Sequence, residues 1–226
     1  MQAVILAGGE GALLKPLTLD RPKPLLPIVD RPHLSYILGM LEAANIHRVI
    51  ITVDYLGEQI ERYIKEKDSH IPITIYHVKE FKGTYSLLVD LHDQLEDEFL
   101  VINGDCMFDI ELDQVLLRFK ALESPLGIVA RHEKDILGKG GLEVKDDLLQ
   151  SIVSTPPSED HDLMSDAQIY YMQKKIFSMM EGENISSIHL DLVQKALDKQ
   201  IAVHIHEMMG FWAILGRITP YLESND

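Results

Sequence analysis

Three glycines within four positions follow a short apolar stretch at the start of the chain. Residues 6–12 read Leu-Ala-Gly-Gly-Glu-Gly-Ala. Glycine lets the backbone adopt a positive φ angle and lets a ligand approach the main chain closely. Successive exposed N–H groups in such a turn form a concave site for anions. The pattern indicates a phosphate-binding turn, although an ordinary glycine turn without a ligand is the alternative. The candidate binding residues are Leu6, Ala7, Gly8, Gly9 and Gly11.

The spacing of these glycines does not match the two best-known phosphate motifs. Leu14 occupies the third-glycine position of a dinucleotide fingerprint, and no Gly-Lys-Ser/Thr follows for a P-loop. A nicotinamide-dependent oxidoreductase also needs an acidic residue about 20 positions beyond the glycines, after a second strand. Asp30 is near that distance but lies in a proline-rich segment. An oxidoreductase is therefore the weakest of the functions considered.

A lysine in a proline-rich segment offers a cation to the same site. Residues 21–28 read Arg-Pro-Lys-Pro-Leu-Leu-Pro-Ile. Prolines restrict their own φ angles and those of the preceding residues, so we expect residues 22–27 to be extended and stiff. Lys23 between two prolines is then well placed to meet a phosphate. A solvated lysine in a loop is the alternative.

An aspartate follows an apolar stretch that we expect to form a buried strand. Residues 103–105 read Asn-Gly-Asp and come directly after the apolar run 99–102. Ligands of open α/β sheets bind beyond the carboxyl ends of the strands. Asp105 there could hold Mg²⁺, which prefers oxygen ligands and bridges phosphates. An Asn-Gly-Asp turn without a ligand is the alternative.

A glycine and a hydroxyl open a predicted helix further along the chain. Gly83 and Thr84 precede the helical pattern 84–95. A hydroxyl at a helix N-terminus can cap the helix or face a ligand such as a nucleotide base. Both interpretations fit the sequence equally well.

Alternating strand and helix patterns must position these residues. We expect strands at 3–6, 48–53, 73–78, 99–102 and 127–130, with helices at 33–44, 57–67, 84–95 and 112–122 between them. This rhythm predicts an α/β fold with a parallel, doubly wound sheet.

The second half of the chain is less regular. We expect short antiparallel strands at 141–144 and 149–153, strands at 167–172 and 201–206, a helix at 188–198 and a polar loop at 155–162. A single domain follows, with a nucleotide-binding core of about residues 1–130 and a mixed extension of about 131–226. The end of the chain gives no clear stop, so a further domain beyond residue 226 stays open.

Composition limits the partners and the compartment. The 226 residues carry a formal net charge of −15, which repels nucleic acids and anionic membranes. No apolar run is long enough to span a bilayer, and the N-terminus does not have the pattern of a signal peptide. One cysteine excludes an internal disulfide and fits a reducing compartment. We expect a cytoplasmic protein with neither nucleic-acid nor membrane partners.

Taken together, these motifs resemble those of the sugar-1-phosphate nucleotidyltransferases. The resemblance rests on residues 6–18, on Pro-Lys-Pro-Leu-Leu-Pro-Ile at 22–28, and on Gly83-Thr84, Asn103-Gly-Asp105 and Gly210-Phe-Trp212. It implies a Rossmann-like mixed, mostly parallel sheet with helices on both faces and a sugar-binding extension. It also implies that Lys23 is catalytic, that Asp105 binds Mg²⁺ and that Gly83 and Thr84 contact the base. The substrates would be a nucleoside triphosphate or sugar nucleotide and a sugar 1-phosphate.

The chain departs from the family pattern at charged positions. Leu13 stands where the family has an arginine that faces the triphosphate, and Ile214 stands where it has the second metal-binding aspartate. Residues 154–156, Ser-Thr-Pro, replace a Glu-Lys-Pro whose lysine grips the sugar phosphate. His189 replaces a common glutamate, and we interpret it as a surface histidine on a helix. Lys15 is a candidate substitute for the missing arginine.

Two functions remain after these departures. One is nucleotidyl transfer to a sugar 1-phosphate with impaired turnover and with Mg²⁺ as cofactor. The other is a catalytically dead homologue that binds nucleotide and regulates a partner, for which Mg²⁺ would not be required. Such a protein would assemble with itself or with an active homologous subunit.

Overall fold

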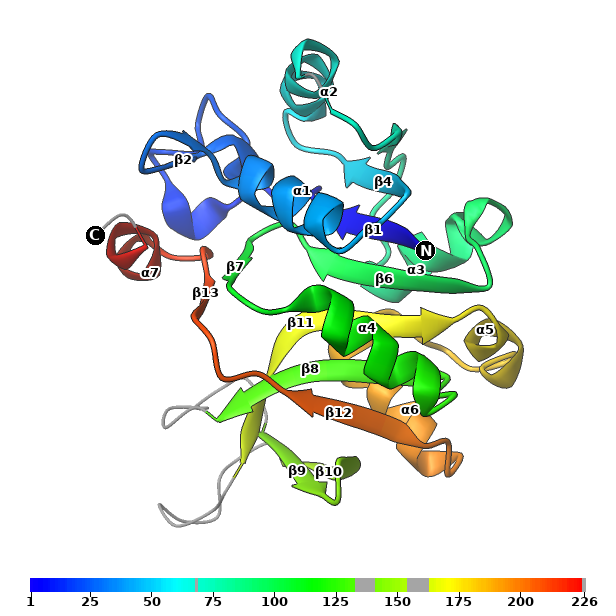
Figure 1. The fold of residues 1–226 in the computed structure, drawn as a ribbon. Helices are drawn as coiled ribbons and strands as arrows, with labels where there is room; N and C mark the ends of the chain where they lie inside the picture. Colours follow the sequence, from blue (N-terminus) through cyan, green and yellow to red (C-terminus); the bar gives the residue numbers. More distant parts are fainter. Residues whose placement is uncertain (68, 133–140, 154–162, 225–226) are drawn as a thin grey trace. The chain divides into compact units, whose positions relative to one another are not determined.

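The computed structural model describes residues 1–67, 69–132, 141–153 and 163–224 (Figure 1). The chain divides into two compact units. The first comprises Met1–Glu80, Val101–Asp113 and Gly210–Asp226, and the second comprises Phe81–Leu100 and Gln114–Met209. Each unit is therefore assembled from segments that are far apart in the sequence.

The first unit is built on parallel strands. β4 pairs with β1 on one side and with β5 on the other, which gives the strand order β5-β4-β1-β6. Two small antiparallel pairs, β2–β3 and β7–β13, complete its strands. The elements of this unit are β1 (Gln2–Leu6), β2 (Pro27–Ile28), β3 (Arg31–Pro32), α1 (His33–Ala43), β4 (Arg48–Val53), α2 (Gly57–Glu66), β5 (Ile73–His77), β7 (Cys106–Phe108), β13 (Trp212–Ile214) and α7 (Ile218–Glu223).

Continuous apolar sequence explains these central strands. Val4 and Ile5 of β1 and Ile50 and Ile51 of β4 are fully buried. Parallel strands that are covered on both faces carry such continuous runs, because neither face meets water. The helix α1 buries the apolar positions that predicted it from their spacing, Leu34, Ile37, Leu38 and Leu41.

The second unit carries the mixed part of the sheet. β8 pairs in parallel with β12 and antiparallel with β11, and β9 pairs antiparallel with β10. β6 (Glu98–Asn103) begins in this unit and ends in the first. The other elements are α3 (Thr84–Asp90), α4 (Leu112–Ala121, whose first two residues fall in the first unit), β8 (Leu126–His132), β9 (Gly141–Lys145), β10 (Leu148–Val153), β11 (Met164–Gln173), α5 (Lys175–Met179), α6 (Val193–Asp198) and β12 (Val203–Glu207).

The structure confirms the mixed α/β class and corrects some of the expected elements. The segment 22–27 is not extended throughout, because Lys23–Leu25 form a turn of 3₁₀ helix. α3 ends at Asp90, and a separate 3₁₀ turn follows at His92–Gln94. The helix expected at 188–198 begins with a π-helical turn, Ile188–Leu192. The loop expected at 155–162 lies outside the described residues.

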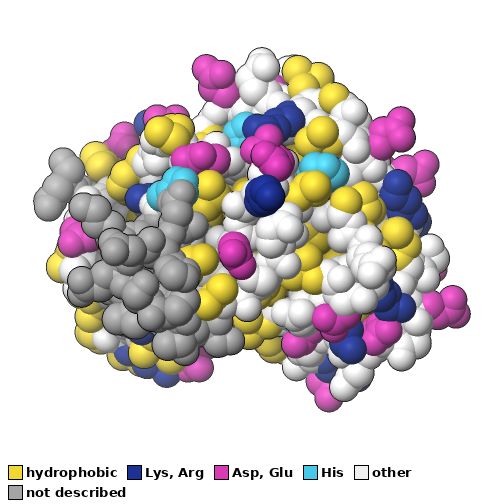
Figure 2. Space-filling model, turned by 90° about the horizontal axis from the view of Figure 1, so that it is seen from below, with side chains coloured by type: hydrophobic (Ala, Val, Ile, Leu, Met, Phe, Trp, Pro, Cys, Tyr) yellow, Lys and Arg dark blue, Asp and Glu magenta, His cyan; other side chains and the backbone are white. Residues whose placement is uncertain are grey.

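No helix in the described part of the chain is both long enough and apolar enough to cross a membrane. Acidic side chains are scattered over the face seen in Figure 2 and do not gather in one patch.

Candidate active site

The glycine turn directly follows β1, and a hydrogen bond from a later residue holds its end. Gly11 has φ +67°, a left-handed conformation that favours glycine, and it precedes the 3₁₀ helix Ala12–Leu14. The hydroxyl of Thr18 donates to the Gly11 carbonyl over 2.9 Å. A Cβ atom at Gly9 would lie 3.7 Å from Nζ of Lys23. The turn therefore runs beside the ammonium group that the sequence assigned to the same site.

Lys23 and Asp105 form an ion pair in the first unit. Nζ of Lys23 lies 2.6 Å from Oδ2 of Asp105, although the two residues are 82 positions apart in the sequence. The side chains are 15% and 17% exposed, so the pair is partly shielded from water and still within reach of a ligand. The glycine turn, the lysine and the aspartate are thus brought together as the sequence predicted.

Backbone hydrogen bonds hold Asp105 at the end of β6. The Gly104 N–H donates to the Leu6 carbonyl over 2.8 Å, which ties this turn to the end of β1. The Leu215 N–H donates to the Asp105 carbonyl, also over 2.8 Å. In the β7–β13 ladder Ile214 pairs with Cys106, the residue after Asp105. The apolar replacement therefore lies on the strand that pairs with the residues directly after Asp105.

The described residues suit a metal ion that is shared with substrate. They contain no group of three or more His, Cys, Asp or Glu side chains that could hold a metal ion. Oδ2 of Asp105 already accepts a hydrogen bond from Lys23, and the Ile214 side chain contains no oxygen. One carboxylate fits an ion that also binds phosphate oxygens and water, but it does not fit an ion that the protein holds alone.

The second apolar replacement is open to solvent. The Leu13 side chain is 67% exposed on the 3₁₀ helix that follows the glycine turn. Lys15, the candidate substitute for the missing arginine, forms an ion pair with Glu10 at 2.5 Å. This contact raises the pKa of Lys15; the hydrogen bond to Glu10 is the larger cause and the charge of Glu10 is the smaller one. The Lys15 ammonium is therefore engaged within its own loop.

Gly83 and Thr84 belong to the second unit and contact the segment before the π-helical turn. Gly83 has φ +118°, and a Cβ atom there would overlap the hydroxyl and the carbonyl oxygen of Ser186. The Thr84 hydroxyl accepts a hydrogen bond from the Ile188 N–H over 2.9 Å. Gly83 is the N-cap residue of α3 and Thr84 is the first residue within the helix, so Thr84 does not occupy the cap position. Contact with a nucleotide base stays a prediction.

His189 is not the surface histidine that we expected. Its side chain is 27% exposed, and Nδ1 lies 2.7 Å from Oδ2 of Asp166. The Asp166 carboxylate is almost fully buried and also accepts from the Tyr170 hydroxyl and the Gln168 N–H. Sequence reasoning missed Asp166, and the only signal was an acidic residue inside the apolar stretch 163–172. Residues 154–156, the other departure, lie outside the described part of the chain.

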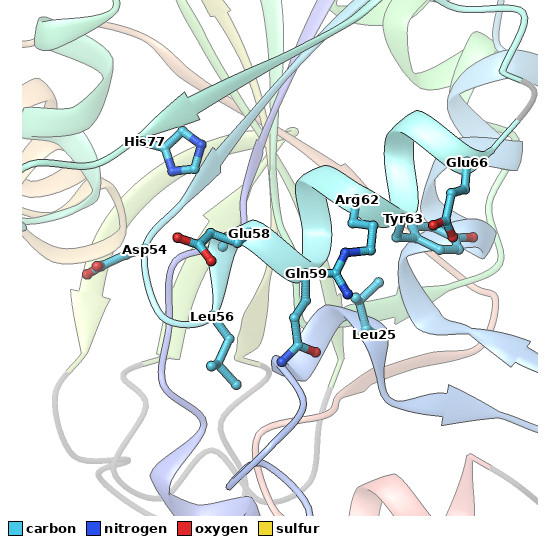
Figure 3. A pocket seen from close by; sticks show the side chains of 10 residues that line it. Leu25, Asp54, Leu56, Glu58, Gln59, Arg62, Tyr63, Glu66 and His77 are labelled. Carbon is cyan, nitrogen blue, oxygen red and sulfur yellow. The ribbon is translucent and has the colours of Figure 1, made fainter.

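A separate hollow in the first unit contains none of the predicted site residues. It has a volume of about 720 Å³ and runs along α2, with side chains of both charges around it (Figure 3). Asp54, at its edge, packs against Gly8 of the glycine turn. The hollow is lined by Leu25, Asp54, Leu56, Gly57, Glu58, Gln59, Arg62, Tyr63, Glu66 and His77.

Comparisons with known sequences match the whole chain to one family. The family model for the nucleotidyl transferases covers residues 2–226. The chain is 31% identical over 228 residues to the bifunctional protein GlmU of Methanocaldococcus jannaschii, covering 100% of the chain and 53% of that protein. It is 33% identical over 178 residues to the D-glycero-alpha-D-manno-heptose 1-phosphate guanylyltransferase of Campylobacter jejuni, covering 79% and 78%. The chain spans about half the length of the GlmU relatives.

Solved structures agree with this assignment. HddC from Yersinia pseudotuberculosis superimposes with a TM-score of 0.80 at 26% identity, covering 99% of this chain and 97% of that one. A second structure of HddC, complexed with GMP-PN, gives a TM-score of 0.79 at 25% identity and the same coverage. The chain therefore belongs to the nucleotidyl transferase family, among the sugar-1-phosphate nucleotidyltransferases.

Proposed function

We propose that the chain binds a nucleoside triphosphate at the glycine turn and transfers its nucleotidyl group to a sugar 1-phosphate. The observation that carries this proposal is the Lys23–Asp105 pair, which lies beside Gly9 at the ends of β1 and β6. The relatives support it, because the Campylobacter protein is named for guanylyl transfer to a heptose 1-phosphate.

The reaction needs charge stabilisation and alignment of the reactants. A phosphate oxygen of the sugar 1-phosphate attacks the α-phosphorus and forms a new P–O bond. The bond from the α-phosphorus to the bridging oxygen breaks, and its electron pair leaves with pyrophosphate. Lys23 neutralises charge on the phosphates, and the N–H groups of the glycine turn orient them. The two reactants are thereby held for in-line displacement.

Family members generally use Mg²⁺, and we propose the same cofactor here. Asp105 is the described side chain that would hold the ion, and a bound ion would neutralise the phosphates. With Ile214 in place of a second carboxylate, most of its ligands must come from the triphosphate and water. We therefore expect Mg²⁺ to bind together with the nucleotide.

Turnover should be slower than in relatives that have the full set of charges. Leu13 offers no positive charge to the departing pyrophosphate, and the Lys15 ammonium is bound to Glu10. A single preorganised donor is worth about 10²–10³ in rate. We therefore propose an enzyme that binds nucleotide normally and transfers the nucleotidyl group at a reduced rate.

Release of pyrophosphate tests the proposal. The protein is incubated with Mg²⁺, each of the common nucleoside triphosphates and a panel of sugar 1-phosphates. Guanosine triphosphate comes first, because HddC was solved with a guanine nucleotide and the Campylobacter relative is a guanylyltransferase. Release by the wild type, abolished in Lys23→Met, is the expected result.

Thermal shift on the same samples separates the alternatives. Stabilisation by nucleotide without pyrophosphate release would favour the regulatory homologue, whose partner would be an active homologous subunit. Neither stabilisation nor release across the panel would contradict both functions.

A further inference from the structure

A fully buried histidine is hydrogen-bonded to the residue after Asp105 and takes no direct part in the proposed reaction. His33 is the first residue of α1, and its side chain is completely inaccessible to solvent. Nε2 lies 2.9 Å from the Cys106 carbonyl oxygen. Burial lowers the pKa of His33 to about 4, against the opposing effects of that carbonyl and of the Asp105 charge. The ring is therefore neutral near pH 7, and because a carbonyl only accepts, Nε2 carries the proton.

The Cys106 carbonyl faces away from the strand that pairs with β7. The Leu215 N–H donates to Asp105, and the Asp109 N–H donates to Phe211, so these pairs are hydrogen-bonded in the β7–β13 ladder. Hydrogen-bonded and non-hydrogen-bonded pairs alternate along an antiparallel ladder. Cys106 and Ile214 then form a non-hydrogen-bonded pair, and the imidazole satisfies a carbonyl that β13 does not reach.

The same histidine also holds the turn that carries Lys23. The His33 backbone N–H donates to the Leu26 carbonyl over 3.0 Å. The Leu26 N–H in turn donates to the Lys23 carbonyl over 3.1 Å and closes the 3₁₀ turn Lys23–Leu25. His33 is thus bonded near both members of the ion pair. Its backbone N–H holds the turn that carries Lys23, and its ring holds the Cys106 carbonyl directly after Asp105.

The chemistry of the ring argues against simple core filling. In the described part of the chain, Nδ1 of His33 is buried with no hydrogen-bond partner. A buried polar atom without a partner is destabilising, and an apolar side chain at this position would avoid that cost. The contribution that offsets it is the hydrogen bond from Nε2 to Cys106.

We propose that His33 is a positioning residue that fixes Lys23 and Asp105 relative to one another. Its ring fixes the backbone immediately after Asp105, and its main chain fixes the turn of Lys23. The value of this arrangement for catalysis rests on the function proposed above, but the arrangement itself does not. It can therefore be tested without turnover.

The test measures how fast the Lys23 amine is labelled by a small acylating reagent, read peptide by peptide by mass spectrometry. An ion-paired amine reacts slowly, so Lys23 should react several-fold faster in Asp105→Asn than in the wild type. His33→Leu removes the ring donor and should raise Lys23 labelling to the same level. His33→Gln keeps an amide donor near the Nε2 position and should leave labelling near the wild-type rate.

A merely structural histidine would behave differently. His33→Leu would then lower the melting temperature but leave the Lys23 labelling rate unchanged, and this result would overturn the proposal. Equal Lys23 rates in the wild type and Asp105→Asn would overturn it as well. If His33→Leu does not fold, the comparison of His33→Asn with His33→Gln replaces it, because the shorter amide falls short of Cys106. The Lys65 amine on α2 serves as the internal control, since none of these variants should change its rate.

A different result would contradict the proposed function without contradicting the role of His33. Loss of nucleotide binding in every sample, with the labelling pattern as expected, would contradict the nucleotidyl transfer and leave His33 as a positioning residue for the ion pair.

Discussion

Leu13 and Ile214 are apolar at two positions where the family resemblance implies charged side chains. Leu13 is 67% exposed, so a longer cationic side chain there can extend into solvent. Ile214 pairs with Cys106, the residue after Asp105, so it lies one position along the β7–β13 ladder from the metal-binding candidate. Both changes leave the glycine turn and Lys23 intact. Binding and catalysis can therefore be separated by single substitutions.

Restoring the charges should restore catalysis. Leu13→Arg supplies a donor to the departing pyrophosphate and should raise kcat about tenfold or more. Ile214→Asp should lower the Mg²⁺ concentration needed for half-maximal rate. Pyrophosphate release at saturating substrates measures both effects. Leu13→Met is the neutral control, and unchanged kcat in Leu13→Arg would show that the missing arginine does not limit this chain.

The buried imidazole predicts a pH dependence of stability. The pKa of His33 is lowered from 6.5 to about 4, so the unfolded state binds more protons between these values. Above about pH 6.5 the imidazole is neutral in both states and does not oppose folding. As the pH falls toward 4, the unfolded state takes up a proton that the folded state does not, and the free energy of unfolding decreases. The free energy of unfolding of the wild type, relative to His33→Gln, should therefore drop by up to about 3 kcal/mol over this window. Urea unfolding of both proteins at several pH values measures it, and parallel pH profiles would contradict it.

Lys23 and Asp105 were predictable from the sequence, but the buried polar side chains His33 and Asp166 were not. Lys23 and Asp105 stand in short motifs whose residue types point to phosphate and metal chemistry. His33 and Asp166 form hydrogen bonds with partners 73 and 23 positions away. A lone histidine at the start of an apolar helix, or an aspartate within an apolar strand, gives no local sign of such a partner.

Among the elements, the start of α3 carries a specific steric constraint. Gly83 combines a positive φ angle with contact against the backbone of Ser186. Gly182 also has a positive φ, +81°, but a Cβ atom there would meet nothing within 4 Å. Alanine at Gly182 would therefore lose stability through the φ angle alone, whereas alanine at Gly83 would lose stability through the φ angle and through overlap with Ser186.

Gly83→Ala should be far more destabilising than Gly182→Ala. We expect a loss of about 1 kcal/mol at Gly182, from the φ angle alone. At Gly83 the overlap with Ser186 should raise the loss to about 3 kcal/mol or more. Denaturant unfolding of both variants measures the difference. Equal losses at the two positions would show that residues 186–188 do not pack against Gly83 in solution.

Element types followed from periodicity, whereas several element ends did not. The helix expected to reach residue 198 in one piece starts as a π-helical turn. The Ser187 hydroxyl caps this turn by accepting from the Asp191 N–H, and the Asp191 carboxylate accepts from the Ser187 N–H. The pair β2–β3 consists of two-residue strands, which are too short to show alternation. The residue that closes the 3₁₀ turn at Lys23, Leu26, is also hydrogen-bonded to the first residue of α1, a contact that the prolines do not announce.

At the scale of the whole molecule, the net charge of −15 acts against the compact state. Raising the salt concentration from about 0.01 M to about 0.15 M shortens the screening length from about 30 Å to about 8 Å. The melting temperature should therefore rise by about 2 °C or more. An uncharged solute at equal osmolality is the control. A falling melting temperature would mean that attractive ion pairs outweigh the general repulsion.

The order of the strands was beyond the sequence. Alternating patterns predicted parallel strands in the first half and antiparallel strands at 141–153, and both are observed. The return of residues 210–224 to the first unit, where β13 pairs with β7, depends on contacts across about half of the chain. No local signal encodes such pairing.

The central claim is that Lys23 beside the glycine turn binds the phosphates of a nucleotide. Calorimetric titration of a non-hydrolysable triphosphate in the presence of Mg²⁺ tests it most directly. Lys23→Met should weaken binding about tenfold or more, because a charge-assisted contact of about 1.5–3 kcal/mol is lost. Lys65→Met, the same substitution on exposed α2, should bind like the wild type. Equal affinities in all three proteins would contradict the account.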